Sequence, residues 1–437
     1  MCMLTKHLKL LLFLLFIATI IFNFYFIGQI EKPDYFYCNE IVSYELEVFN
    51  KSIEFNYPKS CDEQLYHVGF KDFSKLIASD FNYAERPIYI IFVGIIYKFF
   101  LILLGFSKIS PFLILLFSNF IGQILITLIN VVLFMNVFKK YITNNWHQYL
   151  VAFILIISPL VKWGIFDPSH QLLTLTAIIG GLYFKKNKHS INYKSALIFG
   201  TLMLLHRTFL IVFLWIVVSH IMKSFKLRKL LNYIPFLITA LIPTFILTFV
   251  KYLATGTAYD ANTDYWGQFV WLFDFVRGKT RFESDWHCVS IPENFYCYFK
   301  DNLDLLIYLS VPFLCVILFI YKTRLLSSED TDIRNLFSIT LFLYLFWSFI
   351  GWYPPIRFSY YSLGNLIIML FIIFCLMIKD IKFLVIIISS YATYALYLNH
   401  WNDSDIVAIG PEIGLSYIFL IISLGYININ KSELFYS

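Results

Sequence analysis

Apolar runs of about 20 residues recur along the whole chain and constrain its fold more than any other feature, because a helix needs about that length to cross a bilayer. The 437-residue chain is 59% hydrophobic and only 14% charged, whereas soluble domains carry about 25% charged residues. We therefore expect an all-α protein, a polytopic transmembrane bundle of about 11–13 membrane helices. No soluble domain, repeat or linker interrupts residues 1–437, which we interpret as a single transmembrane domain.

The first apolar run, residues 8–28, follows Lys6 and has Lys9 at its start. A cleaved signal peptide has small residues at its cleavage site. Bulky residues, Phe22-Asn23-Phe24-Tyr25-Phe26, occupy that place here. The run is therefore interpreted as a signal-anchor that stays in the membrane.

Clusters of Lys and Arg orient the helices, because they favour the cytoplasmic side of a membrane. They lie at residues 6–9, 139–140, 185–188, 223–229, 322–324 and 379–382. If all are cytoplasmic, most apolar runs pair as an outward and a returning span: 150–166 with 172–184, 231–252 with 303–321, 333–351 with 360–378, and 383–398 with 413–427. Both termini are then inside, and the two large outer loops are residues 29–87 and 256–304.

Two stretches fit this pairing less simply. Residues 196–222 are too long for one span and too short for two, and His206-Arg207 interrupts them, so we expect two short helices that meet on the outer side. Between Pro87 and Lys140 there is room for two helices where the charges require one. We expect residues 87–104 to enter from outside without crossing, and residues 111–138 to cross inward. The alternative is two ordinary spans, which would leave Lys139 and Lys140 outside.

The first outer loop gathers acidic residues beside membrane-length runs. Carboxylates are costly in hydrocarbon, so Asp62 and Glu63 must lie in water at the membrane surface. We expect this acidic loop to be helical, with Asp62 and Tyr66 on one helix face and Glu63 and His67 on another. A partly shielded carboxylate has a raised pKa, which suits a general base. The alternative is a solvated acidic loop.

Three arginines occupy the starts or breaks of apolar runs. Arg86 precedes Pro87, Arg207 follows His206, and Arg357 stands among aromatic residues just before Tyr360. A guanidinium can bind phosphate oxygens in pairs. The alternative for each is an interfacial residue that only anchors its helix.

The outer turns supply further candidates. Asp167 and His170 lie in a short outer turn and are a candidate second catalytic or metal-binding point. Two cysteine pairs lie in the outer loops, Cys288 with Cys297 and Cys38 with Cys61, where disulfides can form; the alternative is that all are free thiols. No GxxxxGK[ST], HExxH, GxSxG or Rossmann glycine pattern is present, so coupling to ATP is not expected.

The order of these elements resembles the GT-C superfamily of integral membrane glycosyltransferases, such as the mannosyl- and aminoarabinose-transferases. The resemblance rests on a signal-anchor followed by short motifs, in this order: Asp62-Glu63-Gln64-Leu65-Tyr66, Arg86-Pro87-Ile88-Tyr89, Lys139-Lys140, Ser158-Pro159, His206-Arg207-Thr208 and Pro355-Ile356-Arg357-Phe358. It implies that Asp62 or Glu63 is the catalytic acidic residue and that Arg86, Arg207 and Arg357 lie near the phosphate of a polyprenyl-phosphate donor.

Two departures from that family bear on the acceptor. The outer loop before Asp62 is long and has its own acids at Asp34, Glu40 and Glu45, and no large outer domain follows the last apolar run. We therefore expect a glycan or lipid acceptor rather than a protein.

The expected function is inverting transfer of a sugar from a polyprenyl-phosphate donor to that acceptor, at the outer, periplasmic face of the inner (plasma) membrane. Tyr66, His170, His206 and Tyr360 are the candidates for contacting the substrate, a divalent cation could assist the phosphate, and nucleic acid is not an expected partner. Two alternatives remain open: a polymerase or ligase of envelope polysaccharides, and a flippase or transporter of lipid-linked glycans. The clustering of ionisable residues at the outer ends, without repeated halves, disfavours the transporter.

Overall fold

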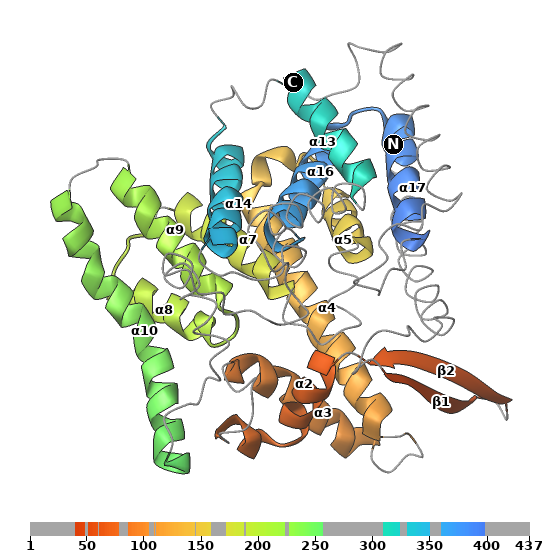
Figure 1. The fold of residues 1–437 in the computed structure, drawn as a ribbon. Coiled ribbons are helices and arrows are strands. Elements are labelled where there is room, and N and C mark those ends of the chain that lie inside the picture. Colours follow the sequence, from red (N-terminus) through yellow and green to blue (C-terminus); the bar gives the residue numbers. More distant parts are fainter. Residues whose placement is uncertain are drawn as a thin grey trace, which may run out of the picture.

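A computed structural model describes residues 40–48, 51–59, 61–77, 86–104, 109, 111–144, 146–158, 172–187, 189–222, 227–256, 309–323, 330–349 and 360–397. Helices make up almost all of this part (Figure 1). In chain order the elements are β1 Glu40–Val48, β2 Lys51–Lys59, α2 Cys61–Lys71, η1 Phe73–Ile77, α3 Pro87–Leu104, α4 Pro111–Val137, η2 Lys139–Tyr141, α5 His147–Ile157, α7 Leu172–Lys186, α8 Tyr193–Met203, α9 Thr208–Met222, α10 Leu227–Thr255, α13 Ser310–Thr323, α14 Thr331–Phe349, η4 Tyr360–Gly364, α16 Asn365–Met377 and α17 Ile381–Tyr397.

Three of these helices are long and apolar enough to cross a membrane: α3, α4 and residues Leu231–Thr255 of α10. Shorter apolar helices, among them α5, α9, α16 and α17, make up much of the remaining described part. The expectation of a helical membrane protein is met to this extent. The larger number of spans remains a prediction, and its first and last members, residues 8–28 and 413–427, lie outside the described residues.

The first outer loop is not entirely helical, which corrects the prediction of a helical first outer loop. Strands β1 and β2 form an antiparallel hairpin in which Val42 is opposite Tyr57 and Leu46 is opposite Ile53. The physical reason is local: apolar and polar residues alternate through both segments, a period of two that fits a strand rather than a helix. The helical prediction holds from Cys61 onward, where α2 begins.

Helix α16 is at the centre of the core. Every residue from Ile367 to Leu376 is buried, as expected for a helix that is apolar on all sides and surrounded by others. It contacts α5, α13 and α14. By contrast, α10 leaves most of its apolar side chains exposed, with Phe245 63% and Phe249 59% exposed. A peripheral helix of this kind is suited to contact with lipid.

The break predicted within residues 196–222 is confirmed. Helix α8 ends at Met203 and α9 begins at Thr208, with His206 and Arg207 in the turn between them. Helix α8 begins at a capping box. The Asn192 side chain accepts a hydrogen bond from the Ser195 backbone N–H, and the Ser195 hydroxyl accepts one from the Asn192 backbone N–H. The chain therefore turns back at the polar pair.

Small residues set how closely α8 approaches α10. A Cβ atom added at Gly200 would lie 2.1 Å from the carbonyl oxygen of Ala240, which is impossible without moving one backbone. Glycine thus allows the direct helix–helix approach that is common in membrane bundles.

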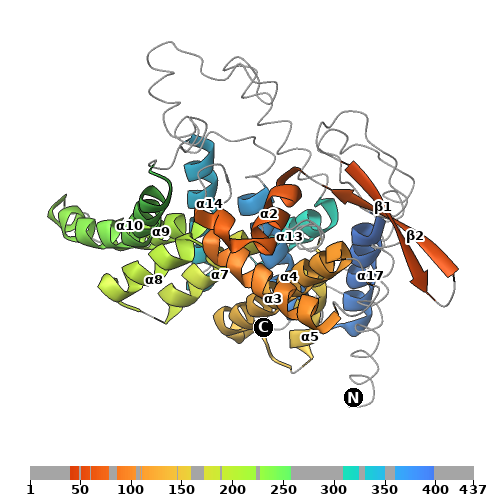
Figure 2. The same ribbon diagram turned by 90° about the horizontal axis from the view of Figure 1, so that it is seen from below.

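The amphipathic segment α2–η1 lies along α3, and Figure 2 shows α2 and α3 side by side from below. A Cβ at Gly94 would meet the Phe73 ring at 2.3 Å, and the ammonium nitrogen of Lys98 lies 3.8 Å from the centre of that ring. Lys71 and Asp72 in the covering segment are exposed. Because such charges need water, this packing favours an α3 that enters without crossing, which remains a prediction.

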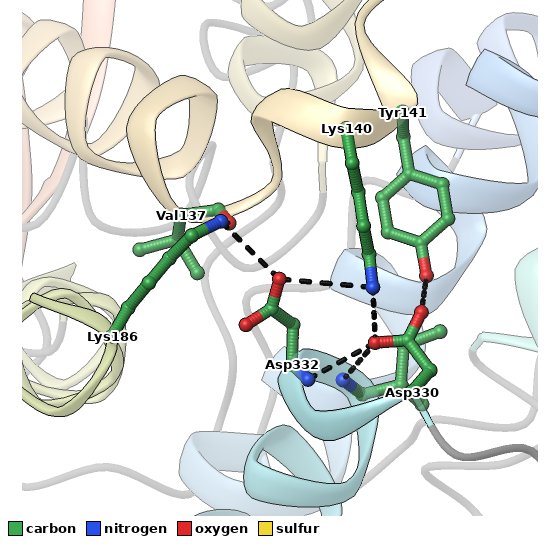
Figure 3. Close-up of polar contacts among 7 residues, drawn as sticks. Val137, Lys140, Tyr141, Lys186, Asp330 and Asp332 are labelled. Carbon is green, nitrogen blue, oxygen red and sulfur yellow. Dashed lines mark hydrogen bonds and ion pairs between the residues drawn. The ribbon is translucent and has the colours of Figure 1, made fainter.

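A polar cluster joins the end of α4 to α7 and α14 (Figure 3). Its members are Lys140, Tyr141, Lys186, Asp330 and Asp332. Lys186 Nζ lies 3.2 Å from Asp332 Oδ2, and Lys140 Nζ lies 3.8 Å from the same oxygen. Both lysines therefore lie at one end of the bundle. Because Lys140 and Lys186 share Asp332, the end of α4 lies on the same side as Lys185 and Lys186. This favours the prediction that residues 111–138 cross inward over the alternative that leaves Lys139 and Lys140 outside.

Asp330 is the centre of this cluster and caps α14. Its Oδ1 accepts the backbone N–H groups of Asp332, at 3.0 Å, and Ile333, at 3.4 Å. The Tyr141 hydroxyl donates to Oδ2, and the Lys140 ammonium forms an ion pair with Oδ1. Burial alone would raise the pKa of Asp330, but Lys140 and Tyr141 outweigh burial and hold it below its ordinary value.

Candidate functional site

Arg86 and Tyr66 form the best-defined contact of the candidate site. The Arg86 Nη1 donates a hydrogen bond to the Tyr66 hydroxyl, and both side chains are buried. Arg86 directly precedes Pro87, which begins α3 in the position where a helix tolerates proline best. The arginine is therefore held at a helix start, with one side of its planar fork fixed by a tyrosine from α2.

Tyr66 is itself fixed by aromatic packing. Its ring meets Tyr89 of α3 edge to face at 5.5 Å and stacks on Phe70 at 6.0 Å. The Tyr89 hydroxyl lies 2.8 Å from Gln123 Nε2 and 3.5 Å from Asn119 Oδ1. Helices α2, α3 and α4 are thus joined beneath Arg86 by rings and hydrogen bonds.

His206 brings the turn between α8 and α9 to the same place. The histidine is buried, and its Nδ1 accepts the backbone N–H of Thr208 at 3.2 Å. Burial first, and then the nearby positive charges of Arg86 and Arg207, hold the pKa of His206 well below its ordinary value. The imidazole of His206 is therefore neutral, with the charges of Arg86 and Arg207 both acting against its protonation. Because Nδ1 is the acceptor, the remaining nitrogen, Nε2, carries the proton.

The acidic candidates lie one helical turn from this cluster in the chain. Asp62 and Glu63 are in the first turn of α2, and Tyr66 and His67 follow in the next. The helix predicted for this segment is therefore present, and its periodicity places positions 62 and 66 on one face and 63 and 67 on another. The side chains of Asp62 and Glu63 are outside the described part.

The remaining candidates are not placed. Asp167, His170, Arg357, Cys288 and Cys297 lie outside the described residues, as does Cys38. Tyr360 begins the short π-helical turn η4, but its side chain is not described. Within the described ranges, no group of three or more His, Cys, Asp or Glu residues is arranged to hold a metal ion. Of the twelve candidate residues, the structure therefore describes the side chains of Tyr66, Arg86, His206 and Arg207, and it brings these together.

The sequence patterns did not single out Asn119 and Gln123, and they included Tyr89 only as the last residue of the Arg86-Pro87-Ile88-Tyr89 motif. The signal was present in the apolar run of α4, where polar residues recur at 119, 123 and 127, four residues apart and on one helix face. Polar side chains repeated along a membrane-length helix are expensive unless they meet partners. That repeat could have predicted a polar contact with a neighbouring helix.

The arrangement suits recognition of an anion. Two guanidinium groups and an imidazole N–H are donors, and arginine matches the geometry of phosphate oxygens. The surrounding rings exclude water, which strengthens each electrostatic contact.

Comparisons of the chain with protein-family models, with curated proteins and with solved structures found no match.

Proposed function

We propose that this protein is a membrane glycosyltransferase that uses a polyprenyl-phosphate-linked sugar as donor and a glycan or lipid hydroxyl as acceptor. The observation that carries the proposal is the buried guanidinium of Arg86, which Tyr66 holds by a hydrogen bond at the start of the apolar helix α3. The planar guanidinium of an arginine can bind two phosphate oxygens at once. A lipid phosphate is an anion that arrives with its tail already in the bilayer.

The reaction needs two kinds of group. A base takes the proton of the acceptor hydroxyl, whose oxygen then attacks the anomeric carbon of the sugar. The bond from that carbon to the phosphate oxygen breaks, and the polyprenyl phosphate leaves with the electron pair. Asp62 or Glu63, in the first turn of α2, is the proposed base. Arg86 and Arg207 are the proposed stabilisers of the leaving phosphate, with Arg357 as a third, and Asp167 is the alternative acid.

The substrate contacts are proposed from the same cluster. Tyr66 is bonded to Arg86, and the charge of Arg86 acts on His206; both residues would contact the donor close to its phosphate. His170 and Tyr360 are proposed for the sugar or the acceptor. The reaction would take place at the outer face of the membrane.

The test is release of polyprenyl phosphate by the reconstituted protein from a panel of polyprenyl-phosphate sugars, a readout that does not depend on the identity of the sugar. We expect Arg86→Lys to lower turnover, because lysine keeps the charge and loses the paired donors. Arg334→Lys, the same exchange at an exposed arginine on α14, is the matched control and should have no effect.

Three outcomes would refute the proposal. A protein that moves the intact donor across the bilayer without ever cleaving it is a flippase. One that accepts only lipid-linked oligosaccharides at both sites is a polymerase or ligase. Equal turnover of Arg86→Lys and Arg334→Lys would remove Arg86 from the site.

A further inference from the structure

Buried polar groups from three helices connect α4 to Arg86. Gln123 and Asn119 on α4 flank the Tyr89 hydroxyl of α3, at 2.8 Å and 3.5 Å. The Tyr89 ring packs edge to face on Tyr66 of α2. Tyr66 in turn accepts the hydrogen bond from Arg86. All of these side chains are at least nine-tenths buried, from 0% exposed for Tyr66 and Tyr89 to 9% for Arg86.

Such a connection is expensive unless it does something that apolar packing cannot. An amide that is buried without its partner costs about 1–3 kcal/mol, and an apolar side chain at position 123 would avoid this cost. One benefit is helix association, since polar side chains form hydrogen bonds between membrane helices. Helix association does not explain why the contacts of Gln123 and Tyr89 lead to Tyr66, the tyrosine that accepts the hydrogen bond from Arg86.

A guanidinium must be held in a fixed orientation to bind an anion, and neighbouring rings and hydrogen bonds can hold it. A planar fork binds two phosphate oxygens only when its plane faces them. Tyr66 fixes one Nη of Arg86, and a rotation of the Tyr66 ring would rotate that fork. The Tyr89 ring limits this rotation, and Gln123 limits the rotation of Tyr89.

We propose that Gln123 and Tyr89 are positioning residues that set the orientation of Arg86 toward a lipid phosphate, although neither contacts the lipid. The inference rests on the proposed function, in which Arg86 binds the donor phosphate. It adds that the affinity of the site for phosphate is set partly from inside the helical core.

The experiment measures the affinity of the full-length protein in nanodiscs for C55 polyprenyl phosphate, with C55 polyprenol as the probe that lacks a phosphate. The variants are Gln123→Met, Tyr89→Phe and the double variant, and thermal stability is measured on each sample. The matched controls are Thr127→Val, whose hydroxyl bonds only the Gln123 carbonyl of its own helix at 2.9 Å, and Tyr97→Phe, a buried tyrosine two turns further along α3. Arg86→Ala reports on the proposed function itself.

We expect each single variant to weaken binding of polyprenyl phosphate by about 3- to 10-fold, the range that one lost hydrogen bond produces. The double variant should be no weaker than the weaker single variant, because both changes break the same connection. The two controls should bind like the parent protein, and polyprenol binding should not change in any variant.

The inference is overturned if Arg86→Ala weakens binding while Gln123→Met and Tyr89→Phe lower only the melting temperature, since that is the result of a purely structural role. If Arg86→Ala leaves phosphate binding unchanged, the role of Arg86 in the proposed function fails first, and this inference fails with it. If Gln123→Met does not fold, Tyr89→Phe, which removes a single oxygen atom, decides between the same outcomes.

Discussion

Asp330 offers the sharpest test of how the bundle is held together at the end opposite the His206 turn of α8. Replacing it with alanine removes three interactions at once: the cap of α14, the bond from the Tyr141 hydroxyl and the ion pair with Lys140. Replacing it with asparagine keeps the oxygen that caps α14, removes the charge, and puts an NH2 group in place of the oxygen that accepts the Tyr141 hydroxyl. The two variants therefore separate the contribution of the cap from the contribution of the electrostatic contacts.

The expected losses follow from these contacts. An aspartate cap contributes about 1 kcal/mol, and a hydrogen bond to a charged acceptor contributes about 1.5–3 kcal/mol. The Lys140 side chain is 43% exposed, so its ion pair contributes only about 0–1 kcal/mol. Asp330→Ala should thus cost about 3–5 kcal/mol, and less if the terms overlap. Asp330→Asn keeps the cap, since Asn and Asp cap equally well, and should therefore cost about 1 kcal/mol less than Asp330→Ala.

The assay is unfolding of the purified protein in mixed micelles as the fraction of denaturing detergent rises, followed by circular dichroism. Asp72→Ala is the matched control, because Asp72 Oδ1 accepts the Ser74 backbone N–H at 2.9 Å in the same local geometry but the residue is exposed. It should change stability little. Equal losses for Asp330→Asn and Asp330→Ala would refute the separation into a cap and a charge, and no loss in either would refute the role of the cluster.

The remaining predictions concern packing, pH and catalysis. Gly200→Ala should destabilise the protein by about 1–3 kcal/mol through overpacking, because its Cβ would lie 2.1 Å from a backbone oxygen of α10; Gly180→Ala, with nothing within 4 Å of the new Cβ, should not, and the same unfolding assay compares them. The lowered pKa of Asp330 means that its contribution is complete above about pH 4 and is lost as the pH falls through its folded pKa; the stability difference between the parent protein and Asp330→Asn should therefore shrink below about pH 4, and a constant difference in acid would contradict this. Asp62→Asn or Glu63→Gln should lower polyprenyl phosphate release by about 10²- to 10⁴-fold without unfolding the protein, and near-normal release by both variants would place the base elsewhere.

The sequence determined most of what depends on short-range periodicity. The break at His206-Arg207 was predictable because two polar residues interrupt an apolar run of fixed length, and the structure begins α9 at Thr208. Helix α2 was predictable around Asp62 for the same kind of reason. The hairpin of β1 and β2 was also predictable, because apolar and polar residues alternate through both strands. The acidic residues of this loop carry no information about its secondary structure, and a helix predicted from them is wrong for these two strands.

The tertiary structure alone decided which ends meet. Nothing near Arg86 in the sequence indicates that His206 approaches it, or that Gln123 supports it through Tyr89 and Tyr66. Asp330 likewise meets Tyr141 across 189 positions of the chain. The physical reason is the range of the forces that act: a helix or strand is decided by residues within a turn or two of one another, whereas the meeting of helix ends depends on the fit of apolar surfaces spread over several helices. Only once those surfaces have packed do the few buried polar side chains find their partners.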